Sequence, residues 1–159
     1  MDEERRQFEL KHFVEEMGLY FEQLGLPRMA GRVLGWLLIS DPPHQSMPEL
    51  VEALLASKAS ISNTTRLLIQ IGLIERISLP GRRRDYFRIK PNAWSQLVKD
   101  EMLKLTAIRK LADRGLRLLD DRDPRFKQRL QEMRDLYAFF ERELPPVIER
   151  WEQTQHQGR

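Results

Sequence analysis

The sequence contains no cysteine. That absence excludes disulfide bonds, thiolate metal sites and thiol-based redox sensing. Histidine is also scarce, because only His12, His44 and His156 occur, far apart in the chain. A metal site would need these residues to converge over long range, so we expect no metal and no cofactor.

Long apolar runs are missing as well. None approaches the roughly 20 residues that a membrane-spanning helix needs. The N-terminal segment MDEERRQFEL is acidic and mixed, unlike a signal or transit peptide. We therefore expect a cytoplasmic protein without a membrane partner.

The usual marks of an enzyme are absent too. The sequence has no glycine loop for phosphates, no paired histidine and carboxylate at helical spacing, and no nucleophile motif. Asp120, Asp121 and Asp123 lack the rest of a calcium-binding loop, and a helix boundary explains them better. We expect a protein that is not an enzyme.

Positive charge, in contrast, is concentrated in one segment. The whole chain has a formal net charge of only +3, but residues 57–90 contain eight basic and two acidic side chains. The basic ones are Lys58, Arg66, Arg76, Arg82, Arg83, Arg84, Arg88 and Lys90, against Glu75 and Asp85. Eight minus two leaves +6, the electrostatic footprint expected of a nucleic-acid contact. A solvated charged face is the alternative interpretation.

The hydrophobic spacing predicts four helices before the charged turn. Leu10, Phe13, Met17, Tyr20 and Leu24 recur in steps of three and four and indicate a first helix, over 10–24. A second helix begins at Pro27 and runs to Asp41; its glycines Gly31 and Gly35 leave a strip where another backbone can approach closely. Ser46 and Glu49 form a capping box for a third. Ser60 is the expected N-cap of a fourth, over 60–72, after a turn at 57–59.

The pattern then changes to strands and back to helices. Segments 73–79 and 86–90 read as a β-hairpin across the turn PGRRR. A helix follows from Asn92, and Asp123 and Pro124 begin another. Within that last helix, Pro145-Pro146 is expected to cause a kink or a restart, because proline supplies no amide donor.

Two short helices with a tight turn, followed by a basic hairpin, indicate a winged helix-turn-helix in a mainly α fold. Helix 60–72 would enter the major groove, and the wing 74–90 would contact phosphates and the minor groove. Arg82 and Arg83 are favoured over Arg84, which could instead pair with Asp85. The candidate DNA-binding residues are Lys58, Ser60, Ser62, Asn63, Arg66, Arg82, Arg83 and Arg84.

Three stretches carry a family resemblance. PRMAGRVLGWLLISDPP, SKASISNTTRLLIQIGLIERI and PGRRRDYFRI resemble the GbsR-like branch of the MarR superfamily of bacterial transcriptional regulators, over roughly residues 10 to 95. The resemblance implies a homodimer of winged-helix subunits, usually a repressor whose DNA affinity a small ligand changes. The chain departs from the pattern at Ala59, where relatives often carry glycine, and at Thr65, where a larger apolar residue is usual.

The terminal helices predict assembly into a homodimer. Apolar residues in the last helix alternate in steps of four and three, a heptad seam, over about 26 residues or roughly 39 Å. The alternative is that this seam packs against another helix of the same subunit. The expected dimerisation residues are Phe13, Met17, Tyr20, Phe126, Leu130, Met133, Tyr137, Phe140 and Leu144.

Four aromatic residues offer a possible effector pocket: Tyr20, Phe21, Trp36 and Trp94. Such residues more often belong to the core, so core packing is the competing interpretation.

These patterns together predict three regions and one function. The regions are an N-terminal dimerisation helix (1–25), a winged helix-turn-helix domain (26–91) and a C-terminal dimerisation region (92–159). The function is sequence-specific, dimeric DNA binding in transcriptional regulation, with recognition of a pseudopalindrome; that the protein is a ligand-responsive repressor is what the family resemblance implies. The alternative is a winged-helix interaction module whose basic wing binds an acidic protein.

Overall fold

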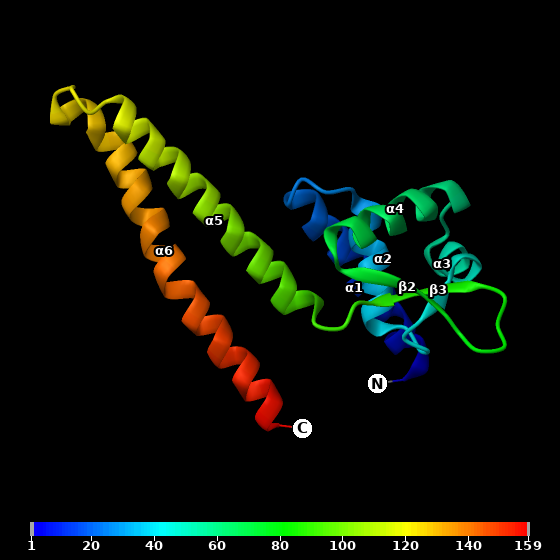
Figure 1. Ribbon diagram of the computed structural model, residues 1–159. Helices are drawn as coiled ribbons and strands as arrows, with labels where there is room; N and C mark the ends of the chain where they lie inside the picture. Colours follow the sequence, from blue (N-terminus) through cyan, green and yellow to red (C-terminus); the bar gives the residue numbers. More distant parts are fainter. Residues whose placement is uncertain (1, 159) are drawn as a thin grey trace. The chain divides into compact units, whose positions relative to one another are not determined.

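The computed structural model describes residues 2–158 and divides the chain into two compact units. The first ends at Ala93 and the second begins at Trp94. The first contains α1 (Glu3–Gln23), α2 (Arg28–Ile39), β1 (Gln45–Ser46), α3 (Met47–Leu54), α4 (Lys58–Ile71), β2 (Ile74–Ser78) and β3 (Asp85–Ile89) (Figure 1). Helices α5 (Ala93–Leu118) and α6 (Pro124–Gln157) make up the second. The predicted fold class, mainly helical with a β-hairpin, is confirmed.

Helix α1 is longer at its N-terminus than the hydrophobic spacing indicates. Asp2 caps it, since the carboxylate Oδ1 accepts a hydrogen bond from the amide of Arg5 at 2.8 Å. Glu3 and Glu4 add negative charge to the first turn, where the helix dipole favours it. Polar and charged residues therefore extend the helix beyond its apolar part.

Helices α1 and α2 pack with almost no space between their backbones. A Cβ atom on Gly31 would lie 2.2 Å from the carbonyl oxygen of Met17, and one on Gly35 would lie 3.0 Å from Met17 Cβ. The predicted strip for close backbone approach is thus confirmed. The buried face of α1 is formed by Val14, Gly18 and Phe21.

The helix-turn-helix follows from two serine caps. At the start of α3, Ser46 and Glu49 form the predicted capping box, with the Ser46 amide 2.6 Å from Glu49 Oε2. The prediction for α4 was wrong. Its N-cap is Ser57, whose Oγ accepts a hydrogen bond from the Ser60 amide at 3.1 Å. Either serine can cap a helix, and capping at Ser57 adds residues 58–60 to the first turn of α4.

The inner face of α4 packs into the core of the first unit. Ile61, Thr65 and Leu68 are all buried. The hydroxyl of Thr65 donates a hydrogen bond to the carbonyl oxygen of Ser62 at 3.1 Å. The polar group of this buried threonine is therefore satisfied.

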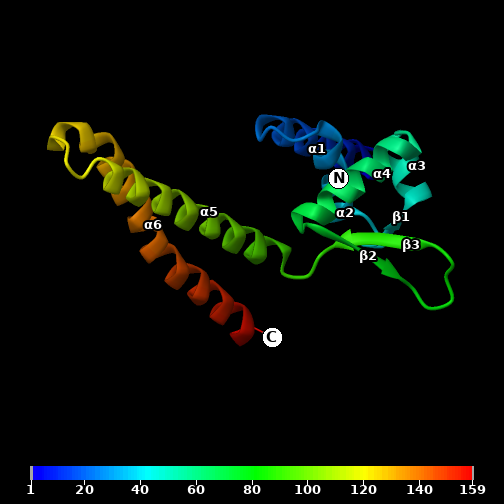
Figure 2. The same ribbon diagram turned by 45° about the horizontal axis from the view of Figure 1, so that its top comes forward.

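The hairpin belongs to a three-stranded antiparallel sheet with the order β1-β3-β2 (Figure 2). In the hairpin, Arg76 pairs with Phe87 and Glu75 pairs with Arg88. The two residues of β1 pair with the other edge of β3. The sequence did not predict β1, because a two-residue strand has no periodicity and depends on its pairing with β3.

In the second unit, α5 and α6 run side by side in opposite directions (Figures 1 and 2). Gly115 allows close approach, since a Cβ there would lie 2.8 Å from Leu130 Cδ1. Arg109 on α5 forms an ion pair with Glu141 on α6, and Arg134 on α6 forms one with Asp113 on α5 at 3.1 Å. These ion pairs and apolar contacts join the two helices.

Helix α6 continues through Pro145 and Pro146, so the expected restart was wrong. Each proline removes one backbone hydrogen bond. Ion pairs to α5 exist on both sides of the prolines, at Glu141 before them and at Glu152, which pairs with Lys99, after them. We attribute the continuity of the helix to this attachment on both sides.

Among the helices in residues 2–158, none is long and apolar enough to cross a membrane. The same residues contain no group of three metal-ligating side chains placed to bind an ion.

Candidate nucleic-acid interface

The outer face of α4 carries polar and cationic side chains next to one another. Ala59, Asn63, Arg66 and Gln70 are exposed and follow each other in steps of four and three, on one side of the helix. The Arg66 guanidinium donates to Asn63 Oδ1 at 3.4 Å, a long hydrogen bond that leaves both side chains free to rearrange. This stripe presents the donor and acceptor types that read base edges.

Two predicted contact residues lie beside this stripe. Ser62 is half-buried, and Lys58 is exposed as the first residue of α4. Ser60, three residues before Asn63, is half-buried in the first turn of α4. Its backbone amide is bound by the Ser57 cap.

The arginines at the hairpin turn are exposed and unpaired. The turn is closed by a hydrogen bond from the Arg82 amide to the Leu79 carbonyl oxygen at 3.1 Å, with Gly81 at a φ of 73°. Within the described part of the chain, no carboxylate lies within ion-pair distance of Arg82, Arg83 or Arg84. Asp85 approaches Arg76 at 3.8 Å instead of Arg84.

The two faces of the hairpin differ in charge. Successive residues in a strand point to opposite faces, so Arg76 and Phe87 share one face while Glu75 and Arg88 share the other. Arg88 is neutralised by Glu75, with 2.7 Å between Nη2 and Oε1. The face with Arg76 therefore carries the available positive charge.

Two shallow depressions lie where α4 meets the hairpin, and Arg76 lines both. The first is lined by Arg66, Ile69, Ile74, Glu75, Arg76 and Lys90. The second is lined by Met47, Pro48, Lys58, Arg76, Arg84, Asp85 and Phe87. Arg76 was not among the sequence-predicted contacts. The signal that could have indicated it is the strand register, which places it on the same face as Phe87.

The four aromatic residues expected to form an effector pocket have different environments. Phe21 is buried against α2, whereas Tyr20 is 53% exposed. Trp36 donates from Nε1 to Gln45 Oε1 at 3.1 Å and lines a cavity of about 330 Å³ between α1, α2 and α3. That cavity is not lined by Tyr20 or Phe21. Trp94 is exposed on α5 in the second unit.

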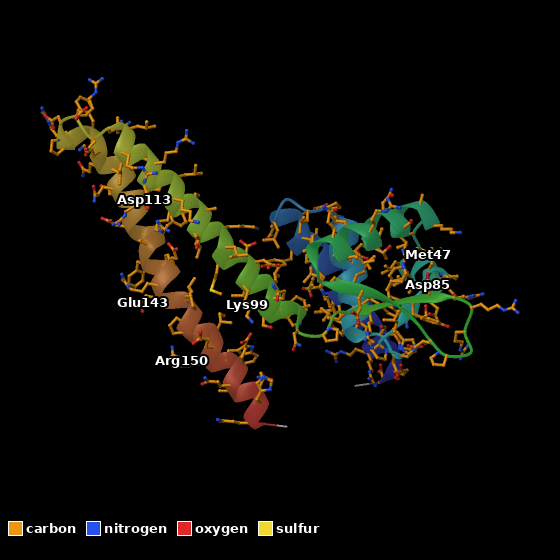
Figure 3. All side chains as sticks on the ribbon, in the orientation of Figure 1. Met47, Asp85, Lys99, Asp113, Glu143 and Arg150 are labelled. Carbon is orange, nitrogen blue, oxygen red and sulfur yellow. The ribbon has the colours of Figure 1, made fainter. Side chains whose placement is uncertain are left out.

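The predicted seam residues of α6 differ in burial. Leu130, Met133, Tyr137 and Leu144 are half-buried. Phe126 and Phe140 are exposed, as are Leu136, Phe139, Val147 and Trp151. Glu143 and Arg150 mark the side of α6 away from α5 (Figure 3). On α1, Phe13 and Met17 are half-buried.

Comparison with known proteins identifies the family. Residues 24–85 match the model of the MarR family, and residues 92–155 match that of MmpR5-like MarR family transcriptional regulators. The chain is 46% identical over 145 residues to the HTH-type transcriptional regulator MmpR5 of Mycobacterium tuberculosis, covering 91% of this chain and 88% of that protein. The chain belongs to the MarR family.

Two further relatives agree with this MarR-family assignment. A crystal structure of a transcriptional regulator matches with a TM-score of 0.75 and 46% identity, covering 91% of this chain and 99% of the other. The HTH-type transcriptional repressor OpcR of Bacillus subtilis is 24% identical, covering 82% of this chain and 78% of that protein. The chain is a winged-helix transcriptional regulator and not an enzyme, as the sequence predicts.

Proposed function

We propose that this MarR-family chain is a homodimeric repressor that reads a pseudopalindromic operator through α4 and the hairpin. The observation that carries the proposal is the set of cations without acidic partners on these two elements. In the described residues, Lys58, Arg66, Arg82, Arg83, Arg84 and Lys90 form no ion pair. Unpaired cations so close together repel one another, and DNA phosphates would offset that repulsion.

The side chains divide into two roles by position. Asn63 and Arg66 lie on the outer stripe of α4 and would contact base edges in the major groove. Lys58 and the arginines of the hairpin turn would contact phosphates, with Arg82 and Arg83 reaching the minor groove. Ser62 lies at the edge of the stripe. Ser60 and Ser62 are both half-buried, so we expect each to contribute less than the exposed side chains.

Dimerisation would cover the apolar surface of the long helices. The exposed apolar residues of α6, from Phe126 to Trp151, extend over most of its length, while none of its described residues is fully buried in the single chain. Exposed apolar residues repeated along such a length indicate a protein–protein interface. Exposed Tyr20 on α1 would add to it, and two subunits would place their α4 helices about 34 Å apart, one DNA turn.

The proposal includes a response to a small ligand. The cavity beside Trp36 has the size of a small-molecule site and connects α1, which we assign to dimerisation, with the end of α3. Ligand binding there would change Trp36 fluorescence and duplex affinity together.

Placement of this chain within the GbsR-like branch is also a proposal, and the three quoted stretches of sequence support it.

Selection from a random pool of duplexes with purified protein tests the function directly. We expect enrichment of a site with two related half-sites, and binding that weakens as salt concentration rises. The alternative function, an interaction module for an acidic protein, would give no enriched sequence and instead capture of the acidic partner. Failure to bind any duplex at low salt would contradict the proposal.

A further inference from the structure

Three cations from different elements line the second depression, between the starts of α3 and α4 and the hairpin. Lys58 comes from α4, Arg76 from β2 and Arg84 from the loop before β3. Asp85 is the only acid in the lining, so three positive charges minus one leave +2. Met47 and Asp85, labelled in Figure 3, are two of the residues that line it. The depression has a volume of about 370 Å³.

Arg76 contacts an aromatic ring of its own hairpin, while its side chain stays 60% exposed. Its guanidinium carbon lies 5.8 Å from the centre of the Phe87 ring, and Phe87 is only 3% exposed. A cation stacked on a buried ring loses less freedom when it binds an anion. Its contact to Asp85 at 3.8 Å joins two exposed side chains and contributes little. Arg76 therefore lies beside the Phe87 ring and is available to bind an anion.

We propose that this depression binds one phosphodiester of the operator, with Arg76 as the central contact and Lys58 and Arg84 on either side. The inference rests on the proposed function. A phosphodiester carries one negative charge and two free oxygens, which match the paired donors of a guanidinium. Because Arg76 also lines the depression that contains Arg66, this phosphate would lie next to the bases that α4 reads.

The site links the recognition helix to the wing. Lys58 belongs to α4, whereas Arg76 and Arg84 belong to the hairpin. A phosphate bound by both elements fixes the hairpin relative to α4 on the DNA. Removing the contact would weaken binding at one backbone position and leave the preference for bases largely unchanged.

A scan with neutral phosphates tests the inference. In the selected duplex, each phosphate is replaced in turn by an uncharged methylphosphonate, and the affinity of the full-length protein is measured. We expect one position per half-site where the replacement costs about tenfold in wild-type binding. Arg76→Ala should bind the unmodified duplex about tenfold more weakly. Its affinity should no longer change when the phosphate at that position is made neutral, but should still change at the other positions as in wild type.

Three variants control for other effects. Arg88→Ala removes an arginine from the opposite face of the same hairpin and should keep the wild-type profile, because Glu75 already neutralises Arg88. Arg84→Ala should lose sensitivity at the same phosphate as Arg76→Ala. The double variant Arg82→Ala, Arg83→Ala should keep that sensitivity, while the slope of log affinity against log salt falls by about one to two units.

The possible outcomes separate the two proposals. If wild-type protein binds the duplex but Arg76→Ala stays sensitive at every phosphate, the phosphodiester site is wrong and the proposed function stands. If inorganic phosphate displaces DNA more than chloride at equal ionic strength, and Arg76→Ala removes that difference, phosphate and DNA compete for the depression, as the proposal requires. If wild-type protein binds no duplex, both proposals fail.

Discussion

At the scale of single residues, Gly31 determines how closely α1 and α2 pack. Its hydrogen faces the backbone carbonyl of Met17, and a Cβ added there would lie only 2.2 Å from the carbonyl oxygen, which leaves no room for a methyl group. A flexible side chain could rotate away, but a helical carbonyl cannot. Every alternative to glycine must therefore push the two helices apart.

We expect Gly31→Ala to lower the free energy of unfolding by about 1–3 kcal/mol, the range typical of overpacking in a close-packed interior. Urea unfolding of the full chain measures it. Gly158→Ala is the matched control, since the nearest atom to its added Cβ is 3.7 Å away. Equal stability of the two variants would show that α1 and α2 do not pack this closely.

Asn63 and Arg66 are the residues that we assign to base recognition. We expect Asn63→Ala and Arg66→Ala each to lose discrimination at particular positions of the selected site, by about 1–3 kcal/mol there. The base discrimination of these two variants is compared with that of Gln70→Ala, which lies further along the same exposed stripe. Binding of single-substitution duplexes measures the effect. Full preference for the selected site in both variants would contradict the assignment of α4.

At the scale of elements, the α5–α6 pair depends on carboxylates whose pKa values are lowered. Hydrogen bonding from Arg109 lowers the pKa of Glu141 below its ordinary 4.5. Burial would raise the pKa of Asp113, but hydrogen bonds from Arg134 and Arg109 together lower it below 3.8. A group with a lowered folded-state pKa stabilises the fold above its unfolded pKa, and the contribution disappears as pH falls through the folded value.

We therefore expect Arg109→Gln to be less stable than wild type at pH 7, with the difference shrinking as pH falls below about 4.5 and vanishing once both carboxyls are protonated. Thermal unfolding followed by circular dichroism at a series of pH values measures this. Arg142→Gln is the control, because Arg142 forms its ion pair only with its neighbour Glu143 on the same helix. A difference that stays constant down to pH 2 would rule out the ion pairs as its cause.

Some of the helices, strands and turns can be predicted from local sequence signals, and others cannot. The hydrophobic spacing, the Ser46–Glu49 capping box and the PGRRR turn are local signals, and each structure that they predict is present. Strand β1 and the course of α6 through its prolines depend on contacts with distant residues. Arg76 was missed for the same reason, since its neighbours Lys58 and Arg84 come from other elements.

At the scale of the whole molecule, the second unit leaves apolar surface exposed, which we propose is covered by a partner. Leu130, Tyr137 and Leu144 are partly covered within that unit. Phe139, Val147 and Trp151 are exposed in the single chain. A second copy is the partner that we propose, because a two-fold interface uses the same surface on both subunits and would cover apolar residues along nearly the whole of α6.

Sedimentation of the full-length protein, alone and with the selected duplex, tests the central claim most directly. We expect twice the chain mass of 18.9 kDa at micromolar concentration, and a complex with two chains on one duplex that carries both half-sites. Halving the site to one half-site should weaken binding strongly, because one set of contacts is lost. A monomer at micromolar concentration, or one chain bound per full site, would contradict the account.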